Sequence, residues 1–494
     1  MAKNIMFQGT GSTVGKSIMT AAVCRVLKDE GYSVAPFKSQ NMALNSFVTI
    51  NGKEMGRAQV VQAEAARIQP MVEMNPVLLK PTSDMGSQVV VNGMVYKNLS
   101  AADYYKNKKY LMGEVKKSYQ VLDDQFDVIV IEGAGSPAEI NLRKNDIVNM
   151  GLAEEVDSPV ILIGDIDKGG VFASIYGTYM LLSESEQNRI KGYIINKFRG
   201  DVKLLEPGIE MFKAYLDIPC IGVVPWSDIR VDDEDSVTDR FTKKEEAPIV
   251  IGVVRLPYLS NFTDFTVLDM EPDVSVRYIL DPEEFDEVDM VVIPGSKSTI
   301  KDLEYLKSKN VDQSIQRAHR KHIPVMGICG GYQMLGTSIS DPNHVETEAD
   351  QIDGLGLIPM TTVMAETKQT VQSEGDLIET PMGLSGDNLQ VKGYEIHMGV
   401  TSLGQGVKPM IRLKDGHTDG AVNDDGNVFG TYLHGVFDHN SFRQALLGKF
   451  RREKGLDSGN QKTYDQLKEE AYDALADVAR EHLDIKLIKE IAGL

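Results

Sequence analysis

A glycine-rich stretch near the start of the chain could bind phosphate. Residues 9–17 read GTGSTVGKS, follow the apolar run NIMFQG and precede a stretch with helical periodicity. A strand, a glycine-rich turn and a helix start direct backbone N–H groups at an anion, and Lys16 and Ser17 stand where a phosphate contact and a Mg²⁺ ligand belong. The predicted ATP-binding residues of this loop are Gly11, Ser12, Thr13, Val14, Gly15, Lys16 and Ser17.

A magnesium–nucleotide site also needs a carboxylate at the end of a neighbouring strand. Glu132 follows the run VIVI, and Asp165 and Asp167 follow VILIG, so the residue types alone leave both positions open. All eight histidines lie between His319 and His482, so the first half of the chain has no imidazole. Its chemistry must use lysines, carboxylates, a metal ion and backbone dipoles, which suits phosphoryl transfer.

A cysteine on a predicted sharp turn could act as a nucleophile. The stretch IPVMGICGGYQMLG combines a buried strand, a Gly-Cys-Gly turn at Cys329 and a helix start. Small neighbours allow the chain to turn and expose the sulfur, and a helix N-terminus favours the thiolate. The predicted base is His434, which lies in NVFGTYLHG just beyond the strand-like part, and His397 in GYEIHMG is the competing candidate.

The elements that must position these residues follow from short, continuous apolar runs. NIMFQG, YSVAPFK, FDVIVIEGAG, SPVILIGDID, KGYIINKF and IPCIGVVP alternate with helical stretches, and a second series comprises APIVIGVVRLP, EVDMVVIPGS, IPVMGICGG and NVFGTYLHG. Buried parallel strands with crossover helices have this pattern. The sequence therefore predicts an α/β fold with two domains, each a mostly parallel sheet flanked by helices, followed by C-terminal helices.

Domain boundaries follow from changes in composition along the 494 residues. We expect a P-loop nucleotide-binding domain at 1–232, a charged linker at 233–247, a second α/β domain at 248–450 and a helical extension at 451–494. The last segment reads as amphipathic helices, which we expect to pack on the second domain.

The net charge and the number of cysteines limit the classes of partner and the cellular compartment that this chain fits. A net charge of −20 argues against nucleic acid or an anionic membrane as the main partner, because either needs a basic face. Three widely spaced cysteines fit reduced thiols. No signal peptide or membrane-spanning stretch is recognisable, so a cytoplasmic enzyme is expected. The sequence predicts no oligomeric state.

The phosphate loop resembles that of dethiobiotin synthetase-like ATPases. GTGSTVGKS has five residues between Gly9 and Gly15, as those loops do, rather than the four of GxxxxGK[ST]. The resemblance implies that Mg·ATP activates a carboxylate. It favours Glu132, in EGAG, as the Mg²⁺ ligand beside Ser17. It also places Lys38 near the phosphate and substrate, and Asn196 at the adenine.

The cysteine region resembles class I glutamine amidotransferases. Their GxCxGxQ motif is matched by Gly327, Cys329, Gly331 and Gln333. The resemblance implies that the backbone N–H groups of Gly295 and Ser296, in PGSKST, and of Gly330 receive the oxyanion. Many of these enzymes carry a glutamate two residues after the histidine, where this chain has Val436, so the group that orients His434 is left open.

Over roughly residues 3–450 the chain resembles the glutamine-dependent corrinoid amidases of cobalamin biosynthesis. The resemblance is carried by FKSQNMALNS, GRAQVVQAEAA, MNPVLLKPTSDMGSQVVVNG, VNMGLAEEVDSPVILIGDIDKGGVFAS, INKFRGD, PYLSNFTDF, PGSKST, GICGGYQMLG and GYEIHMG. It implies that ATP with Mg²⁺ and glutamine drive amidation of the b, d, e and g carboxylates of adenosyl-cobyrinic acid a,c-diamide. The corrinoid is then a substrate, and no protein-bound prosthetic group is implied.

The resemblance leaves two alternative functions open, and it does not settle which residues contact the corrinoid. The alternatives are the sister enzyme that makes the a,c-diamide and a regulatory P-loop ATPase with a glutamine-sensing domain. The corrinoid contacts are expected in the polar segment between residues 38 and 92, where loop stabilisation is the competing role for each side chain. The predicted contacts are Lys38, Gln40, Asn41, Asn45 and Arg57.

Overall fold

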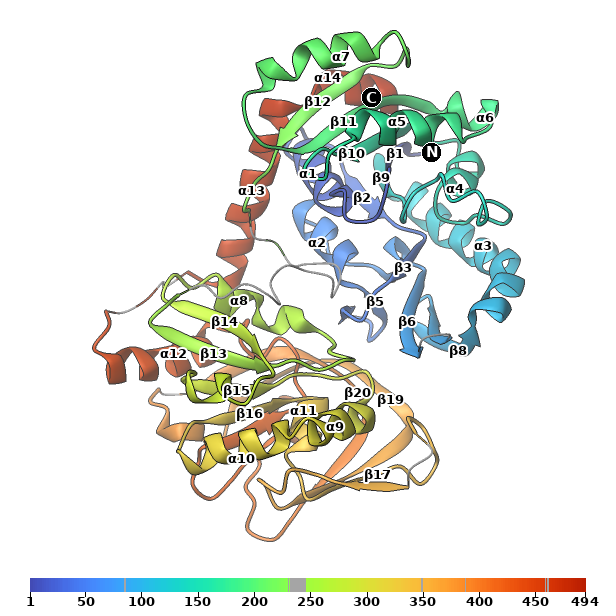
Figure 1. The fold of residues 1–494 in the computed structure, drawn as a ribbon. Helices are drawn as coiled ribbons and strands as arrows, with labels where there is room; N and C mark the ends of the chain where they lie inside the picture. Colours follow the sequence, from blue (N-terminus) through green and yellow to red (C-terminus); the bar gives the residue numbers. More distant parts are fainter. Residues whose placement is uncertain are drawn as a thin grey trace. The chain divides into compact units, whose positions relative to one another are not determined.

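The computed structural model divides the chain into two compact units. It describes residues 1–83, 86–229, 231, 246–347, 350–386, 388–457, 459 and 462–494. Unit 1 contains residues 1–43, 54–234 and 468–494, and unit 2 contains residues 44–53 and 235–467. Most of the predicted linker, residues 233–245, lies outside the described residues. Each unit is described by itself below (Figure 1).

Unit 1 is built on a fully parallel sheet of six strands in the order β12-β11-β10-β1-β9-β2. These strands are the six apolar runs of the first predicted series, so that prediction is confirmed. The order places β1, which leads into the phosphate loop, between β9 and β10. Their bounds are β1 Lys3–Gly9, β2 Val34–Phe37, β9 Val128–Glu132, β10 Val160–Asp165, β11 Ile190–Phe198 and β12 Cys220–Pro225.

Helices and a smaller sheet complete the main chain path of unit 1. The helices are α1 Lys16–Asp29, α2 Arg57–Ala65, α3 Ala101–Asp123, α4 Met150–Glu155, α5 Val171–Met180, α6 Glu184–Gln187 and α7 Glu206–Phe212. The smaller sheet has the order β3-β6-β7-β8, with bounds β3 Gln40–Met42, β6 Val77–Ser83, β7 Gly86–Val91 and β8 Met94–Ser100. Two short strands follow β3 in the sequence: β4 Ser46–Val48, whose residues belong to unit 2, and β5 Glu54–Gly56, which belongs to unit 1.

The C-terminal helices are α13 Tyr464–His482 and α14 Ile485–Ala492, drawn in red in Figure 1. Residues 468–494, which include most of α13 and all of α14, belong to unit 1, and this corrects the expectation that these helices pack on the second domain. Leu475, Ala476 and Ala479 of α13 are buried in the core that α1 also lines. The amphipathic pattern predicts an apolar face but not its partner, so the sequence could not assign these helices to a unit.

A buried arginine fixes α13 to α1. The guanidinium of Arg25, on α1, is fully buried and bonds Asp473 through Nε at 3.0 Å and through Nη2 at 2.6 Å, and its Nη2 also bonds Glu469 at 2.6 Å. A buried charge is stable only when it is paired. The helix that packs on Arg25 must therefore carry acidic residues on one face, as α13 does with Glu469 and Asp473, four positions apart.

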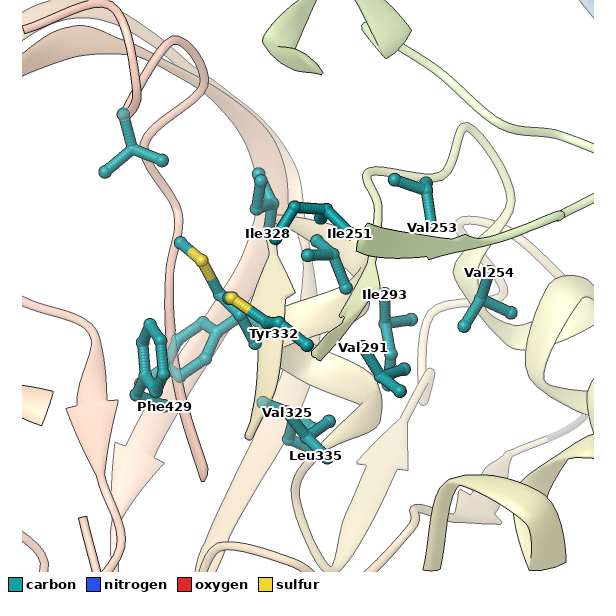
Figure 2. Packing of buried hydrophobic residues seen from close by; sticks show 14 of the residues in the cluster. Ile251, Val253, Val254, Val291, Ile293, Val325, Ile328, Tyr332, Leu335 and Phe429 are labelled. Carbon is teal, nitrogen blue, oxygen red and sulfur yellow. The ribbon is translucent and has the colours of Figure 1, made fainter. Parts of the chain in front are cut away.

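Unit 2 contains a six-stranded sheet in the order β14-β13-β15-β16-β24-β23, parallel except for its last pair. Its central strands are continuous apolar runs whose side chains fill a shared core (Figure 2). The second predicted α/β domain is confirmed. The bounds are β13 Ile249–Val254, β14 Val274–Ile279, β15 Met290–Ile293, β16 Val325–Ile328, β23 Ala421–Val422 and β24 Val428–Thr431.

Unit 2 also contains a mixed, largely antiparallel sheet that the sequence analysis did not predict. Its longest pair is β19 Met360–Leu377 with β20 Gln390–Leu403. The other members are β17 Ser338–Ser340, β18 Gln351–Asp353, β21 Ile411–Leu413 and β22 Thr418–Asp419. The helices of unit 2 are α8 Thr266–Asp269, α9 Thr299–Ser308, α10 Val311–Arg320, α11 Gly330–Met334 and α12 Asn440–Lys454. Among the described residues, no helix is both long and apolar enough to cross a membrane.

Candidate active sites

The phosphate loop of unit 1 connects β1 to α1, and the side chain of Lys16 folds back to bond the backbone of the loop. Gly15 has φ +98°, a left-handed conformation that favours glycine, immediately before the helix begins. Lys16 Nζ donates to the carbonyls of Gly11 at 2.8 Å and Gly135 at 3.2 Å. Asn196 Nδ2, from β11, donates to the carbonyl of Val14 at 2.8 Å. The loop therefore has the strand–turn–helix form that the prediction required.

The Glu132 carboxylate accepts several hydrogen bonds beside this loop. The β9 strand ends at Glu132, whose carboxylate is buried and accepts hydrogen bonds from Ser17 Oγ at 2.8 Å and Lys38 Nζ at 2.9 Å. Gln62 Nε2 donates to the same carboxylate at 2.5 Å. The Ser17 hydroxyl and the Glu132 carboxylate are adjacent hard oxygen donors, the type that Mg²⁺ prefers. These two residues fit a magnesium–nucleotide site.

The other candidate carboxylates are engaged differently. Asp165, at the end of β10, accepts from Lys197 Nζ at 2.9 Å and from the backbone N–H of Asp167 at 2.9 Å. Asp167 pairs with Arg199 at 2.9 Å. Because Glu132 bonds the loop hydroxyl directly, the geometry favours Glu132 over Asp165 as the metal-side carboxylate.

Cys329 of unit 2 lies on the predicted sharp turn between β16 and α11. Its φ of +51° and ψ of −107° place a non-glycine residue in a rarely occupied backbone region. Its backbone N–H donates to the carbonyl of Thr431 on β24 at 2.8 Å, which fixes the turn to the sheet. A Cβ on Gly330 would lie 3.0 Å from the backbone nitrogen of Ser296, so glycine allows the two loops to approach. The strained turn matches the nucleophile elbow.

An aspartate that the sequence analysis did not identify orients His434. Asp264 Oδ2 lies 2.7 Å from His434 Nδ1, and its Oδ1 accepts from the backbone N–H of Gly435 at 2.8 Å. The His434 and Asp264 side chains are 1% and 2% exposed. Asp264 belongs to the 3-10 helix Phe262–Phe265, within the PYLSNFTDF stretch, where no sequence pattern indicates its partner. It holds the histidine in place of the glutamate that Val436 replaces.

The protonation of His434 follows from these contacts. Burial alone would lower its pKa, but the charges of Asp264 and Cys329, together with hydrogen bonds to both, raise the pKa of His434 to about 10. Because Nδ1 bonds Asp264, Nε2 is the nitrogen left for Cys329. At neutral pH His434 is therefore an imidazolium, and its positive charge beside the Cys329 sulfur favours nucleophilic attack by that sulfur.

The predicted oxyanion loop lies against the same histidine. A Cβ on Gly295 would come within 2.7 Å of His434 Cε1, so this position tolerates only glycine without a shift. The Ser296 hydroxyl donates to Asp302 at 2.5 Å, which anchors the loop to α9. The structure thus brings Gly295, Ser296, Gly330, Cys329 and His434 into one region of unit 2.

Two protein-family models cover most of the chain. Residues 5–236 match the CobQ/CobB/MinD/ParA nucleotide binding domain, and residues 250–442 match the CobB/CobQ-like glutamine amidotransferase domain. Three cobyric acid synthases align over nearly their full lengths. That of Clostridium botulinum (strain Loch Maree / Type A3) is 50% identical over 500 residues, covering 100% of both chains. Those of Clostridium acetobutylicum and Clostridium kluyveri are 51% and 50% identical, covering 99% of this chain and 99% and 98% of theirs.

The chain belongs to the cobyric acid synthase family. Membership confirms the resemblance to corrinoid amidases, with a nucleotide-binding domain preceding a glutamine amidotransferase domain. The roles of individual residues stay predictions, and their positions in this family member are described next.

Four of the predicted corrinoid contacts lie in unit 1, and two of them, Lys38 and Asn41, are linked to Glu132, the second through Gln59. Lys38 is bonded to that carboxylate, and Asn41 Nδ2 donates to Gln59 Oε1 at 3.3 Å. Gln40 accepts a hydrogen bond from Tyr104. Arg57 begins α2 and is 6% exposed.

Asn45 is placed apart from that set. Its side chain is 1% exposed and lies in unit 2, where Oδ1 accepts from the backbone N–H of Phe262 at 3.1 Å. The loop-stabilising role, which competed with corrinoid contact in the sequence analysis, describes this placement.

Two glutamines of α2 belong to the nucleotide site but were not singled out from sequence. Gln59 and Gln62 are both fully buried, and both approach Glu132 Oε2, at 3.5 and 2.5 Å. Fully buried amides three positions apart share one helix face, which is unusual for polar side chains. The polar pair on an otherwise apolar face of GRAQVVQAEAA is the signal that could have identified them.

His397, the competing base, has other partners in this cobyric acid synthase family member. Its Nδ1 lies 2.9 Å from the carbonyl of Gly399 and its Nε2 lies 3.3 Å from Glu395. The ring stacks on Tyr432 with centroids 3.8 Å apart. Both ring nitrogens are occupied, so the geometry favours His434 as the base.

A half-buried carboxyl, that of Glu346, supports α9, the helix that follows the oxyanion loop. Glu346 Oε2 accepts from the backbone N–H of Ile300 at 3.2 Å, and burial raises the pKa of Glu346 from 4.5 to about 7. Below pH 4.5 the carboxyl is neutral whether the chain is folded or unfolded. Between pH 4.5 and 7 only the unfolded chain releases the proton, so this group lowers stability as pH rises, by up to about 3 kcal/mol.

The Glu346→Gln variant removes this titration and should gain stability relative to the unmodified chain as pH rises. Urea denaturation at pH 5 and pH 8 measures the difference in the free energy of unfolding at each pH. We expect the variant's relative stability to increase by about 2–3 kcal/mol between the two conditions. An equal difference at both pH values would contradict the raised pKa.

Proposed function

We propose that this chain is an ATP- and glutamine-dependent amide ligase that amidates the b, d, e and g carboxylates of adenosyl-cobyrinic acid a,c-diamide to give adenosylcobyric acid. The observation that carries the proposal is the full-length identity of 50–51% to cobyric acid synthases. The two constellations described above supply the two half-reactions that such a ligase needs: release of ammonia from glutamine and activation of a carboxylate.

Cys329 and His434 account for ammonia release. The Cys329 sulfur attacks the side-chain amide carbon of glutamine, and the oxygen's developing charge is received by backbone N–H groups of the Gly295–Ser296 loop and Gly330. His434 gives its proton to the leaving nitrogen, so ammonia departs and a thioester remains. Water, deprotonated by His434, then cleaves the thioester to glutamate, which returns Cys329 and the protonated His434 to their starting state. Asp264 holds the imidazole through both steps.

The phosphate loop and its neighbours account for carboxylate activation. A corrinoid carboxylate oxygen attacks the γ-phosphorus of ATP, ADP leaves, and the resulting acyl phosphate is attacked by ammonia, which expels inorganic phosphate. Lys16 and the backbone N–H groups of residues 11–17 hold the phosphates, and Lys38 offsets charge between phosphate and carboxylate. Bound Mg²⁺ would neutralise phosphate charge, and Ser17 and Glu132 would hold it.

The remaining assignments follow from this proposal. Asn196 would contact the adenine in addition to holding the loop. Lys38, Gln40, Asn41 and Arg57 would donate to the corrinoid's peripheral carboxylates and amides. The three free thiols fit an enzyme of the cytoplasm, where small-molecule substrates are its partners.

Mass spectrometry of cobyrinic acid a,c-diamide tests the proposal directly. The corrinoid is incubated with Mg·ATP and either glutamine or ammonium chloride, and a reaction without ATP serves as the control. We expect up to four successive exchanges of a carboxyl OH for NH₂ with each nitrogen source and none without ATP. An unchanged corrinoid under both nitrogen sources would remove the corrinoid assignment.

A further inference from the structure

One buried carboxylate of α9 bonds two separate loops of unit 2. The Asp302 side chain is fully buried, its Oδ2 accepts from the Ser296 hydroxyl at 2.5 Å, and its Oδ1 accepts from the backbone N–H of Tyr258 at 3.1 Å. Ser296 belongs to the predicted oxyanion loop, and Tyr258 belongs to the loop that leads to Asp264. All four residues lie in unit 2, so the whole arrangement is internal to it.

The Asp302 carboxylate does not cap its own helix. An acidic residue near the start of a helix commonly bonds or faces the first N–H groups of that helix. Helix α9 begins at Thr299, yet among the described residues the Asp302 carboxylate accepts only from Ser296 and Tyr258, which both lie outside the helix. Burial raises the pKa of Asp302 to about 6, so at neutral pH it is ionised and both oxygens are acceptors. The carboxylate therefore serves the two loops.

These two loops also pair through their backbones. The Ser260 N–H donates to the carbonyl of Gly295 at 2.9 Å, and the Lys297 N–H donates to the carbonyl of Tyr258 at 2.9 Å. An antiparallel bridge lies between these two bonds. Asp302 joins the same loops a third time, so the oxyanion loop is held by backbone and side-chain bonds together.

The pairing fixes the direction of the peptide between Gly295 and Ser296. In a trans peptide the C=O and the N–H point in opposite directions. Because the Gly295 carbonyl points at Ser260, the Ser296 N–H points away from it, and a Cβ on Gly330 would lie 3.0 Å from that nitrogen. Among the described residues no group accepts from the Ser296 N–H. Gly330 directly follows Cys329, so this N–H is a donor presented to the turn of the nucleophile.

The Ser296 hydroxyl strengthens this arrangement. It donates to Asp302 and accepts from the Ser298 N–H at 3.0 Å. A bond to a carboxylate is charge-assisted and stronger than a bond between neutral groups. Without the carboxylate, backbone bonds alone would oppose rotation of the peptide before Ser296, and that rotation would turn a carbonyl instead of an N–H toward Cys329.

We propose that Asp302 is a positioning residue of the glutaminase site, which holds the Ser296 N–H toward the oxyanion that forms when Cys329 attacks glutamine. This inference deepens the proposed function and rests on it, because that oxyanion forms only if Cys329 hydrolyses glutamine. The negative charge develops during the attack, so the donor stabilises the tetrahedral intermediate more than the bound substrate. Asp302 therefore acts on kcat and has little effect on the KM for glutamine.

The test measures glutamate release by the Asp302→Asn variant, with cobyrinic acid a,c-diamide and Mg·ATP present. Asparagine has nearly the same size but a single acceptor oxygen, so it cannot accept from both loops. We expect kcat to fall at least about 30-fold, with the KM for glutamine within about threefold. Alkylation of Cys329 by iodoacetamide forms no oxyanion, so its rate, followed by peptide mass spectrometry, should stay within about twofold.

Two further variants test whether Asp302 acts through the oxyanion loop. Glu304→Gln makes the same type of change at an exposed position of α9, and as the matched control it should keep both kcat and the alkylation rate. Ser296→Ala removes the other partner of the bond at a half-buried position and should also lower kcat. Combined with Asp302→Asn, it should lower kcat no further than Asp302→Asn alone, because both changes break one link.

The outcomes separate this inference from the proposed function. An unchanged kcat in both Asp302→Asn and Ser296→Ala would overturn the inference. Losses that multiply in the double variant would do the same, as would an equal fall in the alkylation rate, which would mean that the sulfur itself is disturbed. An unmodified chain that forms no glutamate from glutamine would instead overturn the proposed function, and this inference with it.

Discussion

Cys329→Ala should lose glutamine-dependent amidation by at least about 10⁴-fold and retain ammonia-dependent amidation. In the proposed mechanism the Cys329 sulfur attacks glutamine and so releases ammonia, whereas carboxylate activation uses residues of unit 1. Removing the sulfur leaves no nucleophile on the turn, and no neighbouring hydroxyl stands in its place among residues 327–331. The measurement is the rate of amide formation by mass spectrometry with each nitrogen source.

Cys220→Ala is the matched control for this variant. Cys220 lies on β12 of unit 1 and is partly exposed, and its sulfur bonds the carbonyl of Gly222 and the side chain of Tyr193. It should retain both activities. A Cys329→Ala variant that loses ammonia-dependent amidation equally would mean that the sulfur is needed in the amidation step, contrary to the division between two sites.

The elements that carry the chemistry could be predicted from sequence because their signals are local. The strands β1, β9 and β16 are four to seven residues long and are built around apolar runs. Each is followed by a turn that contains glycine, and the glycines indicate where the chain turns sharply. Gly15 and the Gly-Cys-Gly turn at Cys329 are both where the motifs place them. Elements of this kind can be predicted from neighbouring residues because they depend on few contacts with distant parts of the chain.

The parts that escaped prediction depend on partners far away in the sequence. Asp264 and His434 are 170 residues apart, and aspartate in NFTDF also suits an ordinary helix start. The Asn45 amide can stabilise a loop or donate to a substrate, and its chain position suggested the substrate. The side chain instead completes a turn in the other unit. In α13 the apolar stripe was visible, but its partner was set by Arg25 of α1.

Asp264→Asn should reduce glutamine hydrolysis at least about 100-fold with little change in structure. Asparagine matches the size of aspartate but offers one acceptor oxygen and one NH₂ group. If the oxygen keeps the Gly435 N–H, the NH₂ faces His434 Nδ1, which must then be an acceptor. The ring proton moves to Nε2, so the imidazole cannot accept a proton from Cys329.

The pH dependence distinguishes this tautomer effect from a folding defect. With Asp264 present, the pKa of His434 is raised to about 10, so the imidazolium and its stabilising contribution persist from below pH 6.5 and are lost only as pH rises through about 10. Removing the Asp264 charge lowers that pKa, so the alkaline limb of kcat/KM for glutamine should move toward neutral pH.

Asp424→Asn, an exposed turn carboxylate of the same unit, is the control and should keep the profile of the unmodified chain. Ammonia-dependent amidation should be unaffected in both variants, because the phosphate loop, Lys38 and Glu132 do not depend on the histidine. An Asp264→Asn variant with an unmoved alkaline limb and full glutaminase activity would show that Cys329 and His434 act as a dyad. Since the Asp264 carboxylate is the group bonded to His434 Nδ1, we expect the triad to be required for catalysis.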